Sequence, residues 1–322
     1  MIVVVAEHAA GEVNRATWEA IVAAQQLAAR AGNAPLTVVV PGHRAAAETL
    51  AASGVGDVIL LESPALEAYT PDAYILALAD AIPALAPQFV VLAHTYQARD
   101  YVPALAARLD KPLMTDVTRI AAGAGGVTFS RPMFQGKLSA DVRPSGAGPC
   151  FVTVQIGAFR ADQLQKGTPA AVSTRPVAID AGRVRQQPEA PFREAQRAVD
   201  LTQAARIVAV GRGIKSKDQL PVAESLARAL GAELAASRPI CDSGWLPMER
   251  QIGSSGQTVA PRLYVALGIS GAIQHLVGMK GSRTIVAVNK DADAPIFEVA
   301  DYGIVGDLFE IVPAIVAELE KK

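Results

Sequence analysis

The sequence predicts an α/β protein of two domains, and three observations support this prediction. Short, almost wholly apolar runs rich in β-branched residues alternate with longer amphipathic segments, as in parallel sheets covered by helices. This alternation occurs twice, and a stretch rich in Pro, Arg, Gln and Ala separates the two occurrences. The chain has 322 residues, of which 51% are hydrophobic, so it is long enough to bury two cores.

Four apolar runs mark the first half of the chain. They are IVVVA (2–6), LTVVV (36–40), DVILL (57–61) and FVVLA (89–93). The segment between the first two, 14–31, has helical spacing and ends before Gly32, a residue that often stops helices. This order of strands and helices predicts an N-terminal domain with a parallel sheet, similar to nucleotide-binding domains.

The pattern changes between residues 113 and 180. Runs such as VTFSRPMF and CFVTVQI are joined there by turns rich in Gly and Pro. We therefore expect an antiparallel extension of the first domain in this region.

Residues 160–198 carry little strand signal, and we interpret them as a linker that includes RVRQQPEAPFREAQRA. The alternative is a long loop inside one domain, but loops of that length are uncommon in compact domains. We expect an N-terminal domain at 1–195, with the linker from about 160, and a C-terminal domain at 196–322.

A second α/β pattern fills the C-terminal half. Its apolar runs are ARIVAVGRG (205–213), RLYVALG (262–268) and TIVAVN (284–289). Residues 218–231 have the spacing of a helix that ends at Gly231. The tail has helical spacing from Leu308 to Leu319, and Pro313 marks either the start of that helix or a kink in it. This half therefore predicts a doubly wound parallel sheet.

Charge, cysteines and hydropathy exclude several classes of partner. The net charge of −1 lacks the concentrated positive field that nucleic acids require. Cys150 and Cys241 lie far apart and form no metal-binding spacing, which suits a reducing compartment. No run of 18 apolar residues occurs, so we expect no membrane span. The N-terminal MIVVVAEH has no secretory or transit signal, and we expect a cytoplasmic location.

Three stretches of the second half are candidates for ligand binding, because open α/β sheets bind ligands beyond the carboxyl ends of their strands. They are GRG (211–213), QIGSSGQTVAP (251–261) and GISGAIQHLVG (268–278). In the first, glycines let the backbone approach a phosphate that Arg212 would neutralise, although a plain strand-to-helix turn has the same pattern. The second offers several hydrogen-bond donors, or is an ordinary surface loop.

The third stretch resembles the start of a helix. Ser270 is a predicted N-cap, and the amides of Gly271, Ala272 and Ile273 would be free donors at its positive end. His275 would lie one turn further on. An isolated histidine in this position is also compatible with a buried core residue.

We expect no catalytic residue and no metal site. The sequence has no GxSxG motif, and its four histidines follow no metal-binding spacing. Asp291 and Asp293 are more typical of a solvated turn than of a cation site.

The segment LYVALGISGAIQHLVGMKGSRTIVAVNKDADAPIFEVADYGIVGDL closely resembles the signature region of the electron-transfer flavoprotein α subunit. The resemblance extends back through VGRGIKS and AASRPICDSGWLP and covers roughly 205–312. The first half resembles the same family through HTYQARDYVPALAARLDKPLMTDV and the RP turn of FSRPMF.

This resemblance implies a heterodimer with a β subunit, which the N-terminal domain would contact, and one FAD in the C-terminal domain. Such a protein is an electron carrier and not an enzyme with its own substrate. It accepts electrons from flavin dehydrogenases and passes them to a quinone reductase at the membrane or to another acceptor. The positions that match FAD-contacting positions of the family are Arg212, Ser237, Arg238, Ile252, Gly253, Ser254, Ser255, Ser270, Gly271, Ala272, Ile273, Gln274, His275, Asn289 and Asp307.

The resemblance also implies roles for these residues. Arg238 and His275 would tune the redox potential by stabilising negative charge on the flavin ring. Asn289 and Asp307 would hold the ribose, adenine or diphosphate part, and Asp307 also fits a helix N-cap. The family usually has a VGQTG-like loop at 252–256. Here Ser255 keeps a hydroxyl at the Thr position, whereas Ser254 replaces the glutamine.

Two other functions are compatible with the fold class. The first is an NAD-dependent oxidoreductase with tandem nucleotide-binding domains, which predicts a GxGxxG loop with an acidic residue about 20 positions later; neither is evident. The second is a non-redox subunit that keeps the fold as a nucleotide-binding scaffold.

Overall fold

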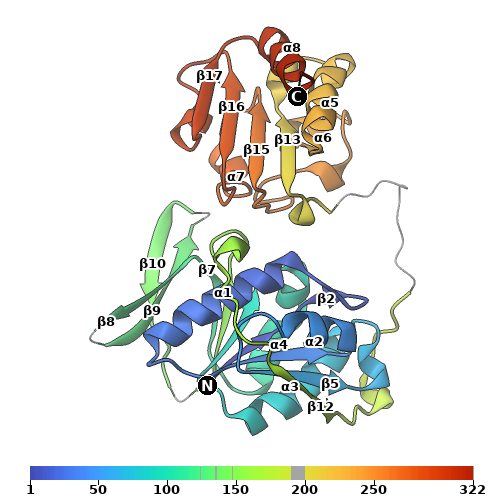
Figure 1. The fold of residues 1–322 in the computed structure, drawn as a ribbon, viewed down its shortest axis with the longest axis vertical. Coiled ribbons are helices and arrows are strands. Elements are labelled where there is room, and N and C mark those ends of the chain that lie inside the picture. The colour runs from blue at the N-terminus through green and yellow to red at the C-terminus, as the bar shows by residue number, and fades with distance from the viewer. Residues whose placement is uncertain (124, 135, 147, 190–199, 322) are drawn as a thin grey trace. The chain divides into compact units, whose positions relative to one another are not determined.

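The computed structural model describes residues 1–123, 125–134, 136–146, 148–189 and 200–321. The chain divides into two compact units, Met1–Phe192 and Arg193–Lys322 (Figure 1). The predicted boundary between residues 195 and 196 lies outside the described residues. Each unit is built around a parallel sheet, as the sequence predicts.

The N-terminal unit contains a seven-stranded sheet with the order β12-β5-β4-β1-β6-β11-β7, in which all neighbouring strands are parallel. The strands are β1 (Ile2–Val5), β4 (Leu36–Pro41), β5 (Asp57–Glu62), β6 (Phe89–Ala93), β7 (Leu113–Val117), β11 (Cys150–Val154) and β12 (Ala171–Pro176). The four apolar runs predicted as strands form β1, β4, β5 and β6. A two-stranded ribbon, β2 (His8–Ala9) and β3 (Glu12–Val13), follows β1.

Helices cover both faces of this sheet. They are α1 (Arg15–Arg30), α2 (Arg44–Leu50), α3 (Pro71–Leu85) and α4 (Tyr96–Arg108), with short 3-10 turns at Pro64–Leu66, Ala161–Gln163 and Ala181–Arg183. Helices α1 and α2 share one apolar core with Val4, whereas α3 and α4 share the other with Val3. Adjacent residues of a strand point to opposite faces, so a continuous apolar run is what a doubly covered sheet requires.

The predicted antiparallel extension is confirmed for only part of its range. Strands β8 (Arg119–Gly123), β9 (Gly126–Met133) and β10 (Leu138–Val142) form a separate antiparallel sheet. The prediction was wrong for CFVTVQI, because β11 lies between β6 and β7 in the parallel sheet. All five residues of β11 are buried, which fits a central strand and not an extension.

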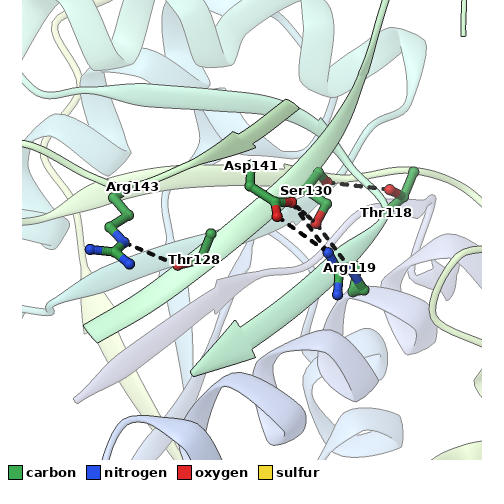
Figure 2. Close-up of polar contacts among 6 residues, drawn as sticks. All are labelled: Thr118, Arg119, Thr128, Ser130, Asp141 and Arg143. Carbon is green, nitrogen blue, oxygen red and sulfur yellow. Dashed lines mark hydrogen bonds and ion pairs between the residues drawn. The ribbon is translucent and has the colours of Figure 1, made fainter. Parts of the chain in front are cut away.

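The small antiparallel sheet has one polar face and one apolar face. On the polar face Ser130 lies directly opposite Arg119 on one side and Asp141 on the other, and the three side chains hydrogen-bond to one another (Figure 2). Phe129, the next residue along β9, is fully buried and packs edge-on against Phe89. The apolar face therefore joins the core of the N-terminal unit.

The segment predicted as a linker from about 160 contains the last strand of the N-terminal sheet. Strand β12 pairs with β5 along its whole length, from Ala171 opposite Asp57 to Pro176 opposite Glu62. Further on, Arg185 binds Asp72 near the start of α3. The strand signal is weak because β12 is an edge strand whose side chains are mostly exposed, and three of its six residues are polar.

The C-terminal unit has a five-stranded parallel sheet with the order β14-β13-β15-β16-β17. The strands are β13 (Arg206–Val210), β14 (Glu233–Ala236), β15 (Leu263–Leu267), β16 (Ile285–Asn289) and β17 (Tyr302–Val305). The helices are α5 (Leu220–Leu230), α6 (Arg238–Asp242), α7 (Ile273–Leu276) and α8 (Leu308–Leu319). Short 3-10 turns lie at Leu201–Gln203, Arg212–Ile214, Lys217–Gln219, Met248–Arg250 and Pro295–Glu298.

The two faces of this second sheet are covered differently. Helices α5, α6 and α8 pack on one face, and α8 runs from Leu308 through Pro313 without a break (Figure 1). The other face is covered mainly by irregular segments that contribute Ile252, Val259, Met279 and Ile296 to the core. No helix in the described part of the chain is long and apolar enough to cross a membrane.

Candidate functional site

Most of the sequence-predicted site residues follow the carboxyl ends of the C-terminal strands, whereas those of the loop 251–257 follow a 3-10 turn. Because all five strands are parallel, these ends lie along one edge of the sheet. The chain runs from β13 outward to β14 and then returns to the other side of β13 to form β15. This reversal is a topological switch point, the position at which open α/β sheets bind their ligands.

Two glycine-rich turns meet at the switch point. The amide of Gly211 donates to Leu267 O at 2.9 Å, and that of Gly213 donates to Gly268 O at 3.1 Å. A Cβ on Gly211 would lie 2.4 Å from Gly268 O, so only glycine allows this approach. The turn after β13 and the turn after β15 are therefore joined by hydrogen bonds. Arg212, in the first of these turns, is exposed to solvent.

The turn after β15 differs from the prediction. Helix α7 begins at Ile273 after Ala272, so Ser270 is not its N-cap, and α7 is only four residues long. Gly271 has φ +86°, which places the chain in a sharp turn before the helix. A Cβ there would lie 2.2 Å from Ile296 N, so the turn packs too tightly against the following loop for a helix to start earlier. Ser270, Ala272, Ile273 and Gln274 are exposed.

His275 is buried within α7, with 6% of its surface exposed. Its Nε2 lies 2.8 Å from the hydroxyl of Tyr264 in β15. Burial lowers the pKa of His275 to about 4, although the nearby backbone of Ile252 acts in the opposite direction. The imidazole is therefore neutral near pH 7, and it can stabilise charge on a ligand through a hydrogen bond and not as a cation.

The second ring nitrogen of His275, Nδ1, is also buried, and a hydrogen bond with the backbone of Ile252 acts on the imidazole. Gln251 provides a buried atom, its side-chain oxygen Oε1, that has no hydrogen-bond partner within the described part of the chain. Buried polar atoms are almost always paired in native proteins, so this oxygen needs a partner. A polar ligand at this edge of the sheet is one source of that partner.

The loop 251–257 joins the site from another direction. It follows the 3-10 turn Met248–Arg250 and not a strand, but the amide of Ile252 donates to Ala236 O at the end of β14. The amide of Ser254 donates to Gln274 O at 2.8 Å, which connects this loop to α7. Gly253 is buried beneath this connection, whereas the side chains of Ser254 and Ser255 remain exposed.

Ser237 and Arg238 follow β14, which is an edge strand of the C-terminal sheet. Ser237 is buried and immediately precedes α6, although its side chain makes no capping hydrogen bond. Arg238 is exposed and its Nε lies 3.2 Å from Asp242 Oδ2, one helical turn further on. The guanidinium keeps most of its surface free for an anionic ligand.

Asn289 and Asp307 follow β16 and β17. Asn289 Nδ2 donates to Ile269 O at 3.0 Å, which holds the turn after β15 in place. Asp307 is the N-cap of α8 and accepts from Phe309 N, as predicted. This hydrogen bond, with the nearby charge of Lys215, lowers the pKa of the Asp307 carboxyl.

The fold thus brings the predicted residues to one edge, with the loops 211–213, 251–257 and 268–275 in direct contact. Three residues with roles here were missed from the sequence: Lys215, Gln251 and Tyr264. Lys215 lies 3.7 Å from Asp307 and 4.5 Å from the centre of the Phe309 ring. For Tyr264 a signal exists, because its hydroxyl is the polar group of the otherwise apolar run YVAL. Gln251 is the first residue of the predicted stretch 251–261, but no role was assigned to it from the sequence.

These residues fit a flavin nucleotide. The glycine turns at the switch point allow close backbone approach, and Arg212 and Arg238 supply positive charge at the exposed rim. The buried Oε1 of Gln251 offers a hydrogen-bond acceptor that no described residue uses.

Comparison with known proteins identifies the family. Residues 2–180 match the electron transfer flavoprotein domain, and residues 200–280 match the electron transfer flavoprotein FAD-binding domain. The chain belongs to the electron transfer flavoprotein α-subunit family. This confirms the resemblance seen in the sequence, and the FAD-binding domain confirms FAD as the cofactor.

Full-length relatives agree with this membership. The electron transfer flavoprotein subunit alpha of Bacillus subtilis is 38% identical over 99% of this chain and 97% of its own length. That of Mycobacterium leprae is 40% identical over 97% of this chain and 96% of its own length. A relative from Anaerotignum propionicum, named acryloyl-CoA reductase electron transfer subunit beta, is 36% identical over 98% of this chain and 94% of its own length.

Proposed function

We propose that this electron transfer flavoprotein subunit is a cytoplasmic electron carrier with no substrate turnover of its own. It holds FAD at the carboxyl edge of the C-terminal sheet. It binds a β subunit through its N-terminal domain, residues 1–195. Flavin dehydrogenases supply the electrons, and a quinone reductase at the membrane or another acceptor receives them. The observation that carries the proposal is the close meeting of the two glycine turns at the switch point, with the buried Oε1 of Gln251 unpartnered among the described residues of the adjoining loop.

In this proposal the chain binds and orients FAD through fifteen residues. They are Arg212, Ser237, Arg238, Ile252, Gly253, Ser254, Ser255, Ser270, Gly271, Ala272, Ile273, Gln274, His275, Asn289 and Asp307. Bound FAD supplies the reversible uptake and release of electrons, a chemistry that these side chains lack.

The side chains tune that chemistry through charge and hydrogen bonds. Arg238 supplies a full positive charge, and His275 supplies a hydrogen bond from a neutral ring. Asn289 and Asp307 lie towards the β17 side and hold the ribose, adenine or diphosphate part. Ser255 keeps a hydroxyl for the flavin ring, while Ser254 lacks the long amide arm that the family usually has here.

The test is a redox titration of the full chain in complex with its β subunit. We expect a yellow protein with FAD bound. Arg238→Ala should lower the one-electron midpoint potential of the flavin by on the order of 40 mV, because an exposed charge-assisted interaction contributes about 1 kcal/mol. Arg238→Lys, which keeps the charge, should shift the potential less.

Three experimental results would each contradict a different part of this proposal. A colourless chain that binds NAD and not FAD overturns the proposal. Full FAD occupancy without electron uptake from any flavin dehydrogenase favours a scaffold. An unchanged potential in Arg238→Ala removes Arg238 from the redox-tuning residues.

A further inference from the structure

A surface pocket with a volume of about 610 Å³ lies wholly within the N-terminal unit. Its walls are helix α3, the end of helix α4 and the segment 178–183, which follows strand β12. We call it the α3–α4 pocket. Sites for small molecules in proteins have volumes of about 300 to 1,000 Å³, so this pocket is large enough for a ligand. None of the residues that line it is among those assigned above to FAD.

One wall of the α3–α4 pocket is held in place by two ion pairs. The segment 175–185 runs along α3 in the direction opposite to the helix. Near its start, Arg175 lies 2.8 Å from Asp80. Near its end, Arg185 places its Nε and Nη2 each 2.9 Å from a carboxylate oxygen of Asp72, in the first turn of α3. Because both ends are attached to the same helix, the middle of the segment forms a defined wall.

Apolar side chains line part of the α3–α4 pocket. They come from all three walls: Leu76 and Ala79 of α3, Leu109 at the end of α4, and Ile179 of the segment. The last three also pack against the apolar core beneath α3 and α4. An apolar ligand group placed here would be removed from water, which contributes about 25 cal/mol for each Å² of apolar surface covered.

Two arginines line the same pocket, Arg108 in the last turn of α4 and Arg183 in the segment. Both are exposed. Within the described part of the chain, neither guanidinium has a hydrogen bond or an ion pair. Paired N–H groups of a guanidinium match the oxygens of a carboxylate or a phosphate, so these two side chains are available to an anionic ligand.

The two carboxylates that line the α3–α4 pocket already have partners. Asp80 is paired with Arg175, and Asp180 Oδ1 accepts from Gly182 N at 2.9 Å. Among the lining residues and their ion-pair partners, three arginines stand against two aspartates. The pocket therefore has an excess of positive charge beside its apolar surface.

We propose that the α3–α4 pocket binds a small amphipathic anion. Its apolar body covers Leu76, Leu109 and Ile179, and Arg108 and Arg183 hold its carboxylate or phosphate head. An inorganic anion leaves the apolar side chains in contact with water, whereas an uncharged apolar molecule leaves both guanidiniums unused. A ligand that combines the two groups uses both parts of the pocket.

The test is a calorimetric titration of octanoate into the FAD-loaded chain in complex with its β subunit. We expect saturable binding, and we expect octanamide and inorganic phosphate to bind about tenfold more weakly, because each lacks one of the two groups. Arg108→Ala and Arg183→Ala should each weaken octanoate binding by about tenfold, the effect of losing one charge-assisted hydrogen bond. Arg30→Ala, at an exposed arginine of α1, should leave the affinity unchanged.

A further variant tests the pocket without changing its charge. Ala178 is exposed and lines the pocket, so Ala178→Phe should fill part of the space without disturbing the core and should weaken octanoate binding. Absence of saturable octanoate binding overturns the proposal. Binding that none of the pocket variants weakens also overturns it, because octanoate then binds elsewhere. Equal affinities for octanoate and octanamide exclude the role of the arginines.

Discussion

Glu19 is a buried acid of the N-terminal unit, and its neutralisation should make this unit more stable at neutral and alkaline pH. The residue lies in α1 with 2% of its surface exposed, and its Oε2 accepts from Gly157 N at 2.6 Å. Burial raises the pKa of the Glu19 carboxyl to about 7, although the Gly157 hydrogen bond and the charge of Arg15 oppose this. The perturbation is Glu19→Gln, which keeps an oxygen for Gly157 and removes the ionisation.

The sign and size follow from proton linkage. In the folded protein Glu19 keeps its proton up to about pH 7, whereas in the unfolded chain it ionises above its ordinary value of 4.5. The folded state therefore binds more protons between these two values, and stability falls as the pH rises through this window. At about 1.4 kcal/mol per pKa unit, the loss amounts to about 3 kcal/mol.

The assay is urea unfolding at pH 4.5, 6 and 8, followed by the fluorescence of Trp18, the neighbour of Glu19 in α1. The chain has two tryptophans, so both proteins carry Trp245→Phe to make the signal local. From pH 4.5 to pH 8, Glu19→Gln should gain about 3 kcal/mol relative to the parent. Glu48→Gln, the same change at an exposed position of α2, should show no such gain. Parallel stability profiles for Glu19→Gln and its parent would refute the reasoning.

Two further perturbations test other contacts. Gly271→Ala places a Cβ 2.2 Å from a backbone nitrogen at φ +86°, so the FAD affinity measured by titration should fall by about tenfold or more. Gly32→Ala, at φ +75° with no atom within 4 Å, should keep that affinity, and equal losses in both variants would contradict the steric argument. Arg185→Ala removes the forked contact that holds the pKa of Asp72 at about 2. Asp72 then protonates at higher pH, and the midpoint of acid unfolding, followed by circular dichroism, should move upward; an unchanged midpoint would exclude a contribution from this pair.

The sequence pattern predicts the central strands well and the edges poorly. Runs such as IVVVA at 2–6 are unambiguous because strands covered by helices on both sides are apolar throughout. The run at 150–156 has the same character, but its surroundings of Gly- and Pro-rich turns suggested an antiparallel context. Only the pairing of β11 with two distant strands determines its direction. Periodicity along the chain contains no information about such partners.

For the site, the sequence predicts which segments take part but not how they interlock. The motif at 268–278 places a turn after β15, whereas the start of α7 depends on a close approach between Gly271 and Ile296. The neutral state of His275 depends on its burial, and its ring is hydrogen-bonded to Tyr264, eleven positions earlier. These are tertiary effects, and the local spacing that placed His275 one turn into a predicted helix cannot reveal them.

The pairing of β12 with β5 also affects the order in which the N-terminal unit can be built during synthesis. Ala171 and Asp57 are register partners 114 positions apart, so the free edge of β5 stays open until the chain has been made beyond Pro176. Contacts of such long range close late, because a large loop must be ordered first. Until then β5 offers unpaired backbone groups to any other extended chain. A protein shortened at residue 160 would keep this exposed edge permanently.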